Sequence, residues 1–328
     1  MSECKLTLLV NLGSPNALST KSIRLFLKNF LSDARVVDLP KILWYPILYG
    51  IILPFRAKKL LHKYDQIWLK KQNLSPLIHY TNNICQNLSH KIQSIDSSHI
   101  VKSAFAYSSP NITDTLNEVI QQYTLANIKS ITIIPLYPQY SSTTTASVFD
   151  IITKYFLDKK YIPTMQFINS FHANEYYINA VVQNIKLSWQ NNDRGEKLIM
   201  SYHSLPVKVI KDGDTYYNEC IKTSELIANK LHLTKDDYKI SFQSKFGTQK
   251  WLTPSTTDVI KEYAKSNIKS IDIICPGFMC DCLETLEEIK CYNKEIFLQN
   301  GGDVFNYIPC INDDDTATSL LLNLSSLS

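Results

Sequence analysis

Glycine is scarce in this chain of 328 residues, which contains only 8 glycines, whereas an average protein uses about 7% glycine. The sequence contains no G-x-G-x-x-G and no G-x-x-x-x-G-K-[S/T] loop. Such loops cradle phosphate groups in dinucleotide- and nucleotide-binding domains. The chain is therefore unlike an NTPase or a dinucleotide-dependent enzyme.

An excess of charge of either sign is also lacking. The formal net charge is only +4, from 34 basic and 30 acidic residues. Proteins that bind nucleic acid usually carry a strong basic stripe, so we expect no nucleic-acid partner. The hydrophobic content of 45% and the charged content of 20% are ordinary for a globular protein. The length allows one large domain or two of medium size.

Cysteines occur eight times, but no pattern typical of a disulfide or metal site holds them. The N-terminal MSECKLTLLV lacks the basic region and cleavage site of a signal peptide. We therefore expect a reducing, cytoplasmic setting without disulfides. Cys280 and Cys282 form a C-x-C pair, with no second pair at zinc or iron–sulfur spacing. We interpret the thiols as small buried hydrophobic groups rather than metal ligands.

Apolar runs typical of strands alternate with helical patterns along the whole chain. Strands are predicted at Lys5–Asn11, His99–Tyr107, Ile128–Leu136, Lys197–Tyr202, Tyr238–Phe242 and Ile268–Cys275. Helices are predicted near 20–31, 57–71, 112–124, 143–157, 174–190, 214–231, 255–265 and 281–298. This alternation predicts an α/β fold with parallel sheets. Sites in such folds lie at the carboxyl ends of the strands.

The chain carries an internal repeat. The sequence NIKSI occurs at 127–131 and again at 267–271, and KLTLLVNLGSP from Lys5 resembles KLIMSYHSLP from Lys197. The two offsets are 140 and 192 residues, which indicates 52 extra residues in the first half. We place this extra chain within 33–80. The repeat predicts two similar domains, 1–165 and 166–328, with the C-terminal tail a candidate to pack back on the first.

The segment Ile42–Phe55 contains no charged residue and is followed by Arg56, Lys58 and Lys59. At fourteen residues with two prolines, it is too short for a membrane-spanning helix, which needs about 20. Two interpretations remain open. The segment is either part of a buried core, or an exposed apolar lip with a basic rim. Such a lip would grip a flat apolar ligand or touch a membrane surface.

Two motifs carry candidate chemistry. His203 ends a predicted strand, and an imidazole with a pKa near 6.5 both transfers protons at neutral pH and binds divalent metals. Asp281, Glu284 and Glu288 follow the last strong strand. Asp281 is placed to cap a helix, and Glu284 and Glu288, four residues apart, share one helix face that would attract a cation or pass protons. Taken singly, each motif also fits a purely structural role, such as a favourable acidic first turn.

Two further stretches strengthen the case for a site. Gln243–Gly247 ends a strand and leads to Trp251, and Pro135–Tyr140 leads into a run of serines and threonines. All of these motifs fall at the carboxyl ends of predicted strands. We therefore expect them to converge on one crevice.

The motifs together resemble the ferrochelatase family. The resemblance is carried by SYHSLP around His203, QSKFGTQKWL from Gln243 and PGFMCDCLETLEEI from Pro276. VNLGSP, LSDARVVDLP, SPL from Ser75 and PLYPQYSSTTT match as well, in family order from about residue 7 to 310. The resemblance implies two Rossmann-like domains with a porphyrin cleft between them. It implies an enzyme that inserts Fe²⁺ into a porphyrin, protoporphyrin being favoured, to form haem.

The resemblance also implies roles for individual residues. His203 and Glu284 would be the catalytic pair and contact the metal, with Asp281 and Glu288 as a proton relay behind them. Metallation must remove two pyrrole protons from a ring that the cleft holds bent. The side chains implied for porphyrin binding are Leu12, Arg56, Tyr64, Ser75, Lys245 and Trp251. In this interpretation 42–55 is the lip of the cleft.

Three departures from the family pattern matter. Some members hold an iron–sulfur cluster through a cysteine where this chain has Ser142, and no cysteine follows Cys310 here. We therefore expect no cluster and no permanently bound cofactor, with Fe²⁺ as a substrate. Ala106 stands where many members have arginine, which removes one polar contact of the usual cleft. Cys282 replaces a histidine seen in some members, which weakens a metal path through that position.

Two other functions compete with iron insertion into a porphyrin. One is a cobalt or sirohydrochlorin chelatase of the same superfamily, and the other is a tetrapyrrole carrier without catalysis. The combination of HSLP and ETLEE disfavours both, because a carrier needs no proton acceptor at the ring centre. The expected partners are a porphyrin and ferrous iron. We also expect peripheral contact with the inner membrane through 42–55.

Overall fold

The computed structural model describes residues 3–245 and 249–325. The chain divides into two compact units, each with its own four-stranded sheet. The first unit contains Met1–Leu136, Ser141–Asn169 and Asp313–Ser328, and the second contains Tyr137–Tyr140 and Ser170–Asn312. The chain therefore passes from one unit to the other more than once.

The first unit is built on a parallel sheet with strand order β2-β1-β3-β4. Its strands are β1 (Cys4–Asn11), β2 (His99–Phe105), β3 (Ile128–Pro135) and β4 (Thr164–Phe167). Its helices are α1 (Thr20–Leu31), α2 (Lys41–Ile47), η1 (Leu48–Ile52), α3 (Leu53–Ile67), α4 (Pro76–Gln93), α5 (Ile112–Tyr123), η2 (Leu125–Asn127), α6 (Thr145–Phe156) and α12 (Asp315–Ser325).

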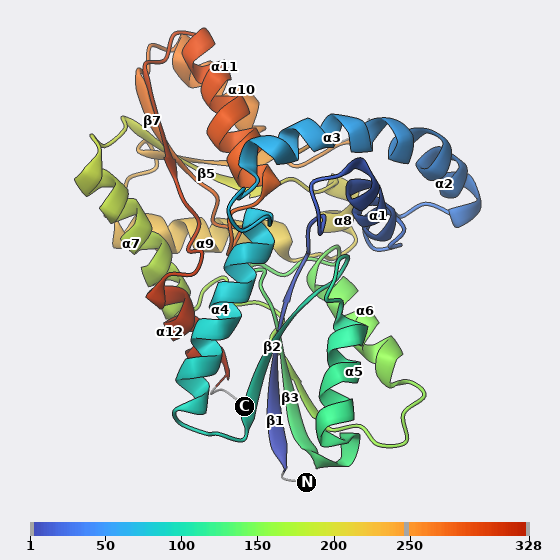
Figure 1. Ribbon diagram of the computed structural model, residues 1–328. Helices are drawn as coiled ribbons and strands as arrows, with labels where there is room; N and C mark the ends of the chain where they lie inside the picture. The colour runs from blue at the N-terminus through green and yellow to red at the C-terminus, as the bar shows by residue number, and fades with distance from the viewer. Residues whose placement is uncertain (1–2, 246–248, 326–328) are drawn as a thin grey trace. The chain divides into compact units, whose positions relative to one another are not determined.

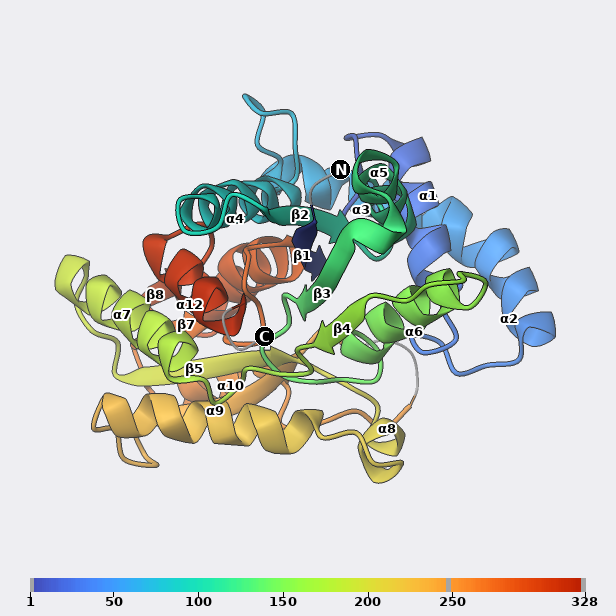
Figure 2. The same ribbon diagram turned by 90° about the horizontal axis from the view of Figure 1, so that it is seen from below.

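Helices cover both faces of this sheet. Every residue of β1 except Lys5 is buried, as expected for a central strand between two helical layers. In the first unit α4 and α12 lie on one face, and α5 and α6 lie on the other (Figure 2). The helices α1, α2 and α3 lie beyond the carboxyl ends of the strands (Figure 1). This segment includes the uncharged stretch Ile42–Phe55.

The second unit repeats the same topology, with parallel strand order β6-β5-β7-β8. Its strands are β5 (Lys197–His203), β6 (Tyr238–Gln243), β7 (Ser270–Ile274) and β8 (Val304–Ile308). Its helices are α7 (Glu175–Asn191), α8 (Val207–Lys211), α9 (Tyr216–Lys230), α10 (Thr256–Lys265), η3 (Glu284–Asn293) and α11 (Lys294–Gln299).

The two faces of the second sheet can be followed along β5. Ile199 packs into a buried cluster with Val259 and Ile260 of α10 and Ile289 of η3. Tyr202 points the other way, where its hydroxyl group lies 2.8 Å from that of Ser224 in α9. Side chains alternate along a strand, so His203 extends from the same face as Ile199 and Ser201. His203 therefore leaves the strand on the face that α10 and η3 cover.

The predicted fold class, α/β with two domains built on parallel sheets, is confirmed. The repeat is real, because β1 and β5 hold the same place in their sheets, as do β3 and β7. The extra chain lies where we expected it, since β1 and β2 are joined by 12–98 whereas β5 and β6 are joined by only 204–237. No helix among the described residues is long and apolar enough to cross a membrane. The porphyrin cleft between the domains stays a prediction.

Candidate active site

The second sheet has its topological switch point between β5 and β7. β5 lies between β6 and β7, so the connections that leave the carboxyl ends of β5 and β7 run to opposite sides. Ligands of open α/β sheets bind in the crevice that this reversal creates. His203 is the last residue of β5, and the segment from Pro276 to Glu288 follows β7. Two of the predicted motifs therefore flank the switch point.

His203 is half-buried and held through one ring nitrogen. Its Nδ1 lies 2.7 Å from the carbonyl oxygen of Ser204. A carbonyl oxygen only accepts hydrogen bonds, so Nδ1 carries the hydrogen of the neutral ring, and Nε2 keeps its lone pair. This arrangement makes Nε2 the atom that can accept a proton or bind a metal ion.

The end of β6 connects His203 to the acidic helix η3. Gln243 pairs with His203 in the sheet register, and its Nε2 donates to the carbonyl oxygen of Glu284 at 2.8 Å. Ser244 adopts a left-handed φ of 66°. Its amide donates to one Glu288 oxygen at 2.8 Å and its hydroxyl to the other at 2.5 Å. The last residue of β6 and the residue after it thus hold the Glu284 backbone and the Glu288 side chain of η3.

The charges of this site influence one another. Burial raises the pKa of the Glu288 carboxyl. The Ser244 hydrogen bonds and the His203 ring oppose this rise, and the Glu284 carboxylate adds to it. Burial, and then the Glu284 carboxylate, hold the pKa of the Cys282 thiol well above its ordinary value. Cys282 thus stays a neutral thiol. The described residues contain no group of three or more histidine, cysteine, aspartate or glutamate side chains in an arrangement that holds a metal ion.

The helix that carries the glutamates differs from the prediction. The sequence predicted an α-helix from 281 capped by Asp281, but η3 is a π-helix that begins at Glu284 without a side-chain cap. The sequence argument placed Glu284 and Glu288 on one face of an α-helix because they are four residues apart. That argument does not apply to a π-helix, whose hydrogen bonds join residues i and i+5. The two side chains nevertheless lie near enough for the Glu284 carboxylate to raise the pKa of Glu288. Glu287 is buried.

Asp281 has a structural environment. It is buried, with its carboxylate accepting hydrogen bonds from Thr285, Tyr307 and Asn312. The side chain of Asn312 in turn accepts a hydrogen bond from the Asp281 amide at 2.8 Å. These contacts tie the start of η3 to β8 and to the end of the unit. Asp281 therefore anchors the segment that carries Glu284, and its part in a proton relay stays a prediction.

The predicted porphyrin-binding residues fall in both units. In the first unit Leu12 and Arg56 are half-buried. Tyr64 is buried against Trp68, and Ser75 is buried with its hydroxyl accepting from the Ile78 amide at the start of α4. Tyr64 and Ser75 thus support the structure around them, and their contact with a porphyrin stays a prediction.

In the second unit Lys245 is exposed, with its Nζ 3.8 Å from the Asp258 carboxylate. Trp251 is half-buried, and its strand neighbour is Pro206, three residues after His203. Phe246 and Gly247 of the predicted motif lie outside the described residues. Trp251 therefore lies beside the loop that follows His203, and its contact with a porphyrin stays a prediction.

Comparison with known proteins agrees with this geometry. The family model described as Ferrochelatase matches residues 7–327. The chain belongs to the ferrochelatase family. It is 41% identical over 318 residues to a ferrochelatase of Teredinibacter turnerae, covering 97% of this chain and 85% of the relative. It is 39% identical over 317 residues to that of Vibrio cholerae, covering 97% and 96%.

A solved structure shares the fold at much lower identity. The structure described as SirB from Bacillus subtilis with Fe3+ has a TM-score of 0.57 and 11% identity, over 98% of this chain and 94% of that one. At this identity the likeness concerns the fold alone. It shows that the paired α/β units of this ferrochelatase family member are an architecture found in other proteins.

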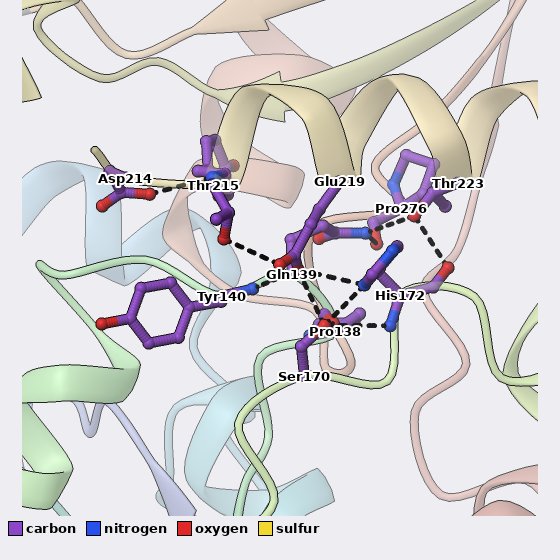
Figure 3. A network of polar contacts seen from close by, with 11 residues as sticks. Pro138, Gln139, Tyr140, Ser170, His172, Asp214, Thr215, Glu219, Thr223 and Pro276 are labelled. Carbon is purple, nitrogen blue, oxygen red and sulfur yellow. Dashed lines mark hydrogen bonds and ion pairs between the residues drawn. The ribbon is translucent and has the colours of Figure 1, made fainter. Parts of the chain in front are cut away.

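The second unit also contains a polar network that the sequence motifs did not predict. Figure 3 shows Glu219 of α9 facing Tyr140, Ser170 and His172. Its carboxylate accepts from the Tyr140 amide at 2.8 Å, the Ser170 hydroxyl at 2.7 Å and the Thr215 hydroxyl at 2.8 Å, and lies 3.1 Å from His172 Nδ1. The predicted Pro135–Tyr140 motif thus contributes a backbone amide to a structural carboxylate.

The neighbouring Gln139 is buried in the same network. Its Nε2 donates to the Thr223 hydroxyl at 3.0 Å and lies 3.4 Å from the Pro276 carbonyl oxygen. The Thr223 hydroxyl donates to the His172 carbonyl oxygen at 2.9 Å. Two segments that enter the second unit from the first, Tyr137–Tyr140 and the chain from Ser170, are therefore both fastened to α9.

We expect Glu219→Gln to destabilise the protein in a pH-dependent way. Burial opposes ionisation of Glu219, but hydrogen bonds from His172, Tyr140, Ser170 and Thr215 outweigh it and lower the pKa. The stabilisation is therefore complete above the unfolded-state pKa and is lost as the pH falls through the folded-state pKa. The loss at pH 7 should be about 1.5–3 kcal/mol, as for hydrogen bonds to a charged group.

Urea unfolding at pH 7 and at pH 4 measures this effect. The exposed Glu225 on the same helix provides the control Glu225→Gln, which should match the wild type at both pH values. A loss for Glu219→Gln that is as large at pH 4 as at pH 7 would contradict the assignment.

Proposed function

We propose that this chain inserts ferrous iron into a porphyrin at the carboxyl edge of the second sheet, with His203 and Glu284 as the reacting pair. Membership of the ferrochelatase family makes the chain an enzyme of haem synthesis that inserts iron into a porphyrin. The observation that supports the assignment of the pair is the free Nε2 of His203 in the same electrostatic group as Glu284 and Glu288. The His203 imidazole and the two glutamate carboxylates can accept protons, and the carboxylates also attract a divalent cation.

The chemistry requires three things of the site. Fe²⁺ replaces two pyrrole hydrogens, so each turnover releases two protons, and the ion must shed its water before it reaches the ring centre. In our proposal the Nε2 of His203 takes a pyrrole proton or binds the entering ion, using the same lone pair. Glu284 guides the ion and accepts the second proton. Glu288, whose pKa burial raises, passes that proton outward.

Residues of both units are proposed to hold the ring. Trp251 offers an aromatic surface beside the histidine loop, and Lys245 offers a cation for a propionate. In the first unit Leu12 offers an apolar contact and Arg56 a guanidinium that binds carboxylates through two parallel hydrogen bonds. Tyr64 and Ser75 would shape the wall behind these side chains. The apolar surface of 42–55 favours protoporphyrin over more carboxylated rings.

The test of this proposal is turnover by variants that still bind porphyrin. We expect His203→Ala to lower the anaerobic rate of Fe²⁺ insertion by about 10²–10⁴-fold, the usual contribution of a general acid or base. Porphyrin affinity should change little, because the substitution leaves the walls of the site in place. Glu284→Gln should be similarly slow, since an amide accepts no proton at neutral pH.

Glu295→Gln is the matched control, because Glu295 is exposed in α11, the helix that follows η3. Glu287, although adjacent to the pair in sequence, is buried and is a poor control. Near-normal turnover by His203→Ala would refute the assigned pair. A wild-type protein that binds porphyrin without any turnover would instead support a carrier.

We also propose that the protein works without a permanently bound cofactor. All eight cysteines are free thiols, and all but Cys85 and Cys291 are buried. Burial raises the pKa of the Cys275 and Cys310 thiols well above the ordinary value, which disfavours thiolate ligands. Protein purified anaerobically should therefore contain no acid-labile sulfide and show no iron–sulfur absorption. Stoichiometric sulfide would show that these cysteines had been misinterpreted.

Peripheral membrane contact through 42–55 is proposed from its exposed side chains. Ile42 and Phe55 are 83% and 73% exposed, and Leu43, Ile47 and Ile51 are exposed as well. Trp44 and Leu48 are buried, so the segment is anchored to the first unit on one side. The segment therefore has one buried face and one exposed apolar face. An exposed apolar surface of this kind, followed by basic residues, suits the boundary of an anionic membrane.

Serine at Ile47, Ile51 and Phe55 should weaken binding to vesicles of anionic phospholipid without unfolding the protein, because these side chains already face water. A co-sedimentation assay with vesicles measures the effect. Serine at Ile95, Leu157 and Ile162, which are exposed and apolar but lie elsewhere in the first unit, forms the control. Equal binding by the two triple variants would argue against a membrane role for the segment.

A further inference from the structure

Asn312 holds the segment that leads into η3 through both polar atoms of its side chain. Its Oδ1 accepts a hydrogen bond from the Asp281 amide at 2.8 Å, and its Nδ2 donates to the Asp281 carboxylate at 2.7 Å. The amide of Asn312 itself donates to the Met279 carbonyl oxygen at 2.9 Å. These hydrogen bonds join the last residue of the second unit to the loop between β7 and η3.

The backbone at Asn312 suits this contact. Its φ of 54° lies in the left-handed region, which asparagine adopts more readily than most residues because its short side chain can hydrogen-bond locally. The following residue is fastened as well, since the Asp313 carboxylate accepts from Asn83 of α4 at 2.6 Å. Asn87 of the same helix donates to the Asp313 carbonyl oxygen at 3.4 Å. Asn312 therefore presents its two polar side-chain atoms to Asp281 from a restrained piece of backbone.

Asp281 passes this restraint on to η3. Its other carboxylate oxygen accepts from the Thr285 hydroxyl at 2.9 Å, and the same hydroxyl accepts from the Cys282 amide at 3.0 Å. Because Asp281 is buried, these hydrogen bonds are stronger than they would be in water. Within the described part of the chain, η3 begins at Glu284 without a side-chain cap. The contacts of Asp281 therefore position the first turn of η3, where Glu284 lies.

We propose that Asn312 is a positioning residue for iron insertion, which acts through Asp281 to hold the Glu284 carboxylate in place. The inference rests on the proposed function, because it gives Asn312 a part in that same reaction. The Asn312 amide transfers no proton itself at neutral pH. A reacting group displaced by about 1 Å can lower a rate by about 10²-fold. Loss of the Asn312 side chain should therefore lower kcat much more than the affinity for porphyrin.

The experiment measures kcat and KM of anaerobic Fe²⁺ insertion, together with equilibrium binding of metal-free protoporphyrin. Asn312→Gly removes the side chain and keeps the left-handed backbone, which glycine adopts without strain. We expect kcat to fall by about 10- to 10²-fold, with KM for the porphyrin and its affinity nearly unchanged. Asn267→Gly is the matched control and should behave as the wild type, because Asn267 is exposed after α10 with a left-handed φ of 63°.

A second variant pair separates positioning from proton transfer. Asn312→Asp sets a carboxylate against the buried Asp281 carboxylate, so it should be at least as slow as Asn312→Gly. Adding Asp281→Asn places an amide opposite a carboxylate again, with donor and acceptor exchanged. The double variant should therefore recover turnover towards the wild-type value. If Asp281 instead relays protons, the double variant stays slow, because an amide accepts no proton at neutral pH.

The proposal is overturned if Asn312→Gly keeps the wild-type kcat, if its lower rate follows from weaker porphyrin binding, or if the double variant stays slow. Urea unfolding identifies a variant that does not fold. If Asn312→Asp fails in this way, Asn312→Gly and its control decide the question. An active wild type with an unaffected Asn312→Gly rejects only the positioning role. A wild type that shows no turnover with ferrous iron rejects the proposed reaction, and the positioning role with it.

Discussion

Parallel pairing of β5 with β6 on one side and β7 on the other is the constraint on which the rest of the site depends. Parallel strands end at the same edge, so His203, Gln243 and the segment after β7 are brought together although they are far apart in sequence. Successive side chains of β5 point to opposite faces of the sheet, and this alternation decides the face from which His203 extends. With Ile199 and Ser201 buried towards α10, His203 must extend towards η3.

Carboxylates in the second unit serve two different physical purposes. Asp281 and Glu219 are surrounded by donors, so their charges fasten segments of chain together. Among the residues that the structure describes, Ser244 provides both donors to the Glu288 carboxylate, and burial raises the pKa of Glu288. A carboxyl group whose pKa is raised by burial takes up a proton at a higher pH than an ordinary carboxyl group, which suits it to proton transfer. This contrast indicates which acidic residues belong to the chemistry and which to the framework.

Much of this architecture could be predicted from the sequence. The NIKSI repeat and the Lys5 and Lys197 strands predicted two like domains, because a repeated strand pattern requires a repeated sheet. The short edge strands β4 and β8 were missed, since a few half-exposed residues give no continuous apolar run. The helix α4 was missed too, although Ser75 as cap and Pro76 in the first turn are ordinary start signals.

The sequence predicted only part of the candidate site. The positions of His203, Glu284 and Glu288 followed from motifs at strand ends, but the π-helix did not, because helix type depends on packing and on contacts such as those of Asp281. Glu219 and His172 gave no signal, since their partners are a backbone amide and hydroxyls supplied by distant segments. Burial of Tyr64 and Ser75 likewise depends on tertiary packing.

A double-mutant cycle on the rate of Fe²⁺ insertion tests most directly whether His203 and Glu284 act as a unit on one substrate. Residues that act together are not additive, because removing either one already disables the shared step. We expect Glu284→Gln to lower the rate far less in a His203→Ala background than in the wild type. Losses in rate that simply multiply would show that the two residues act independently and would refute the shared step.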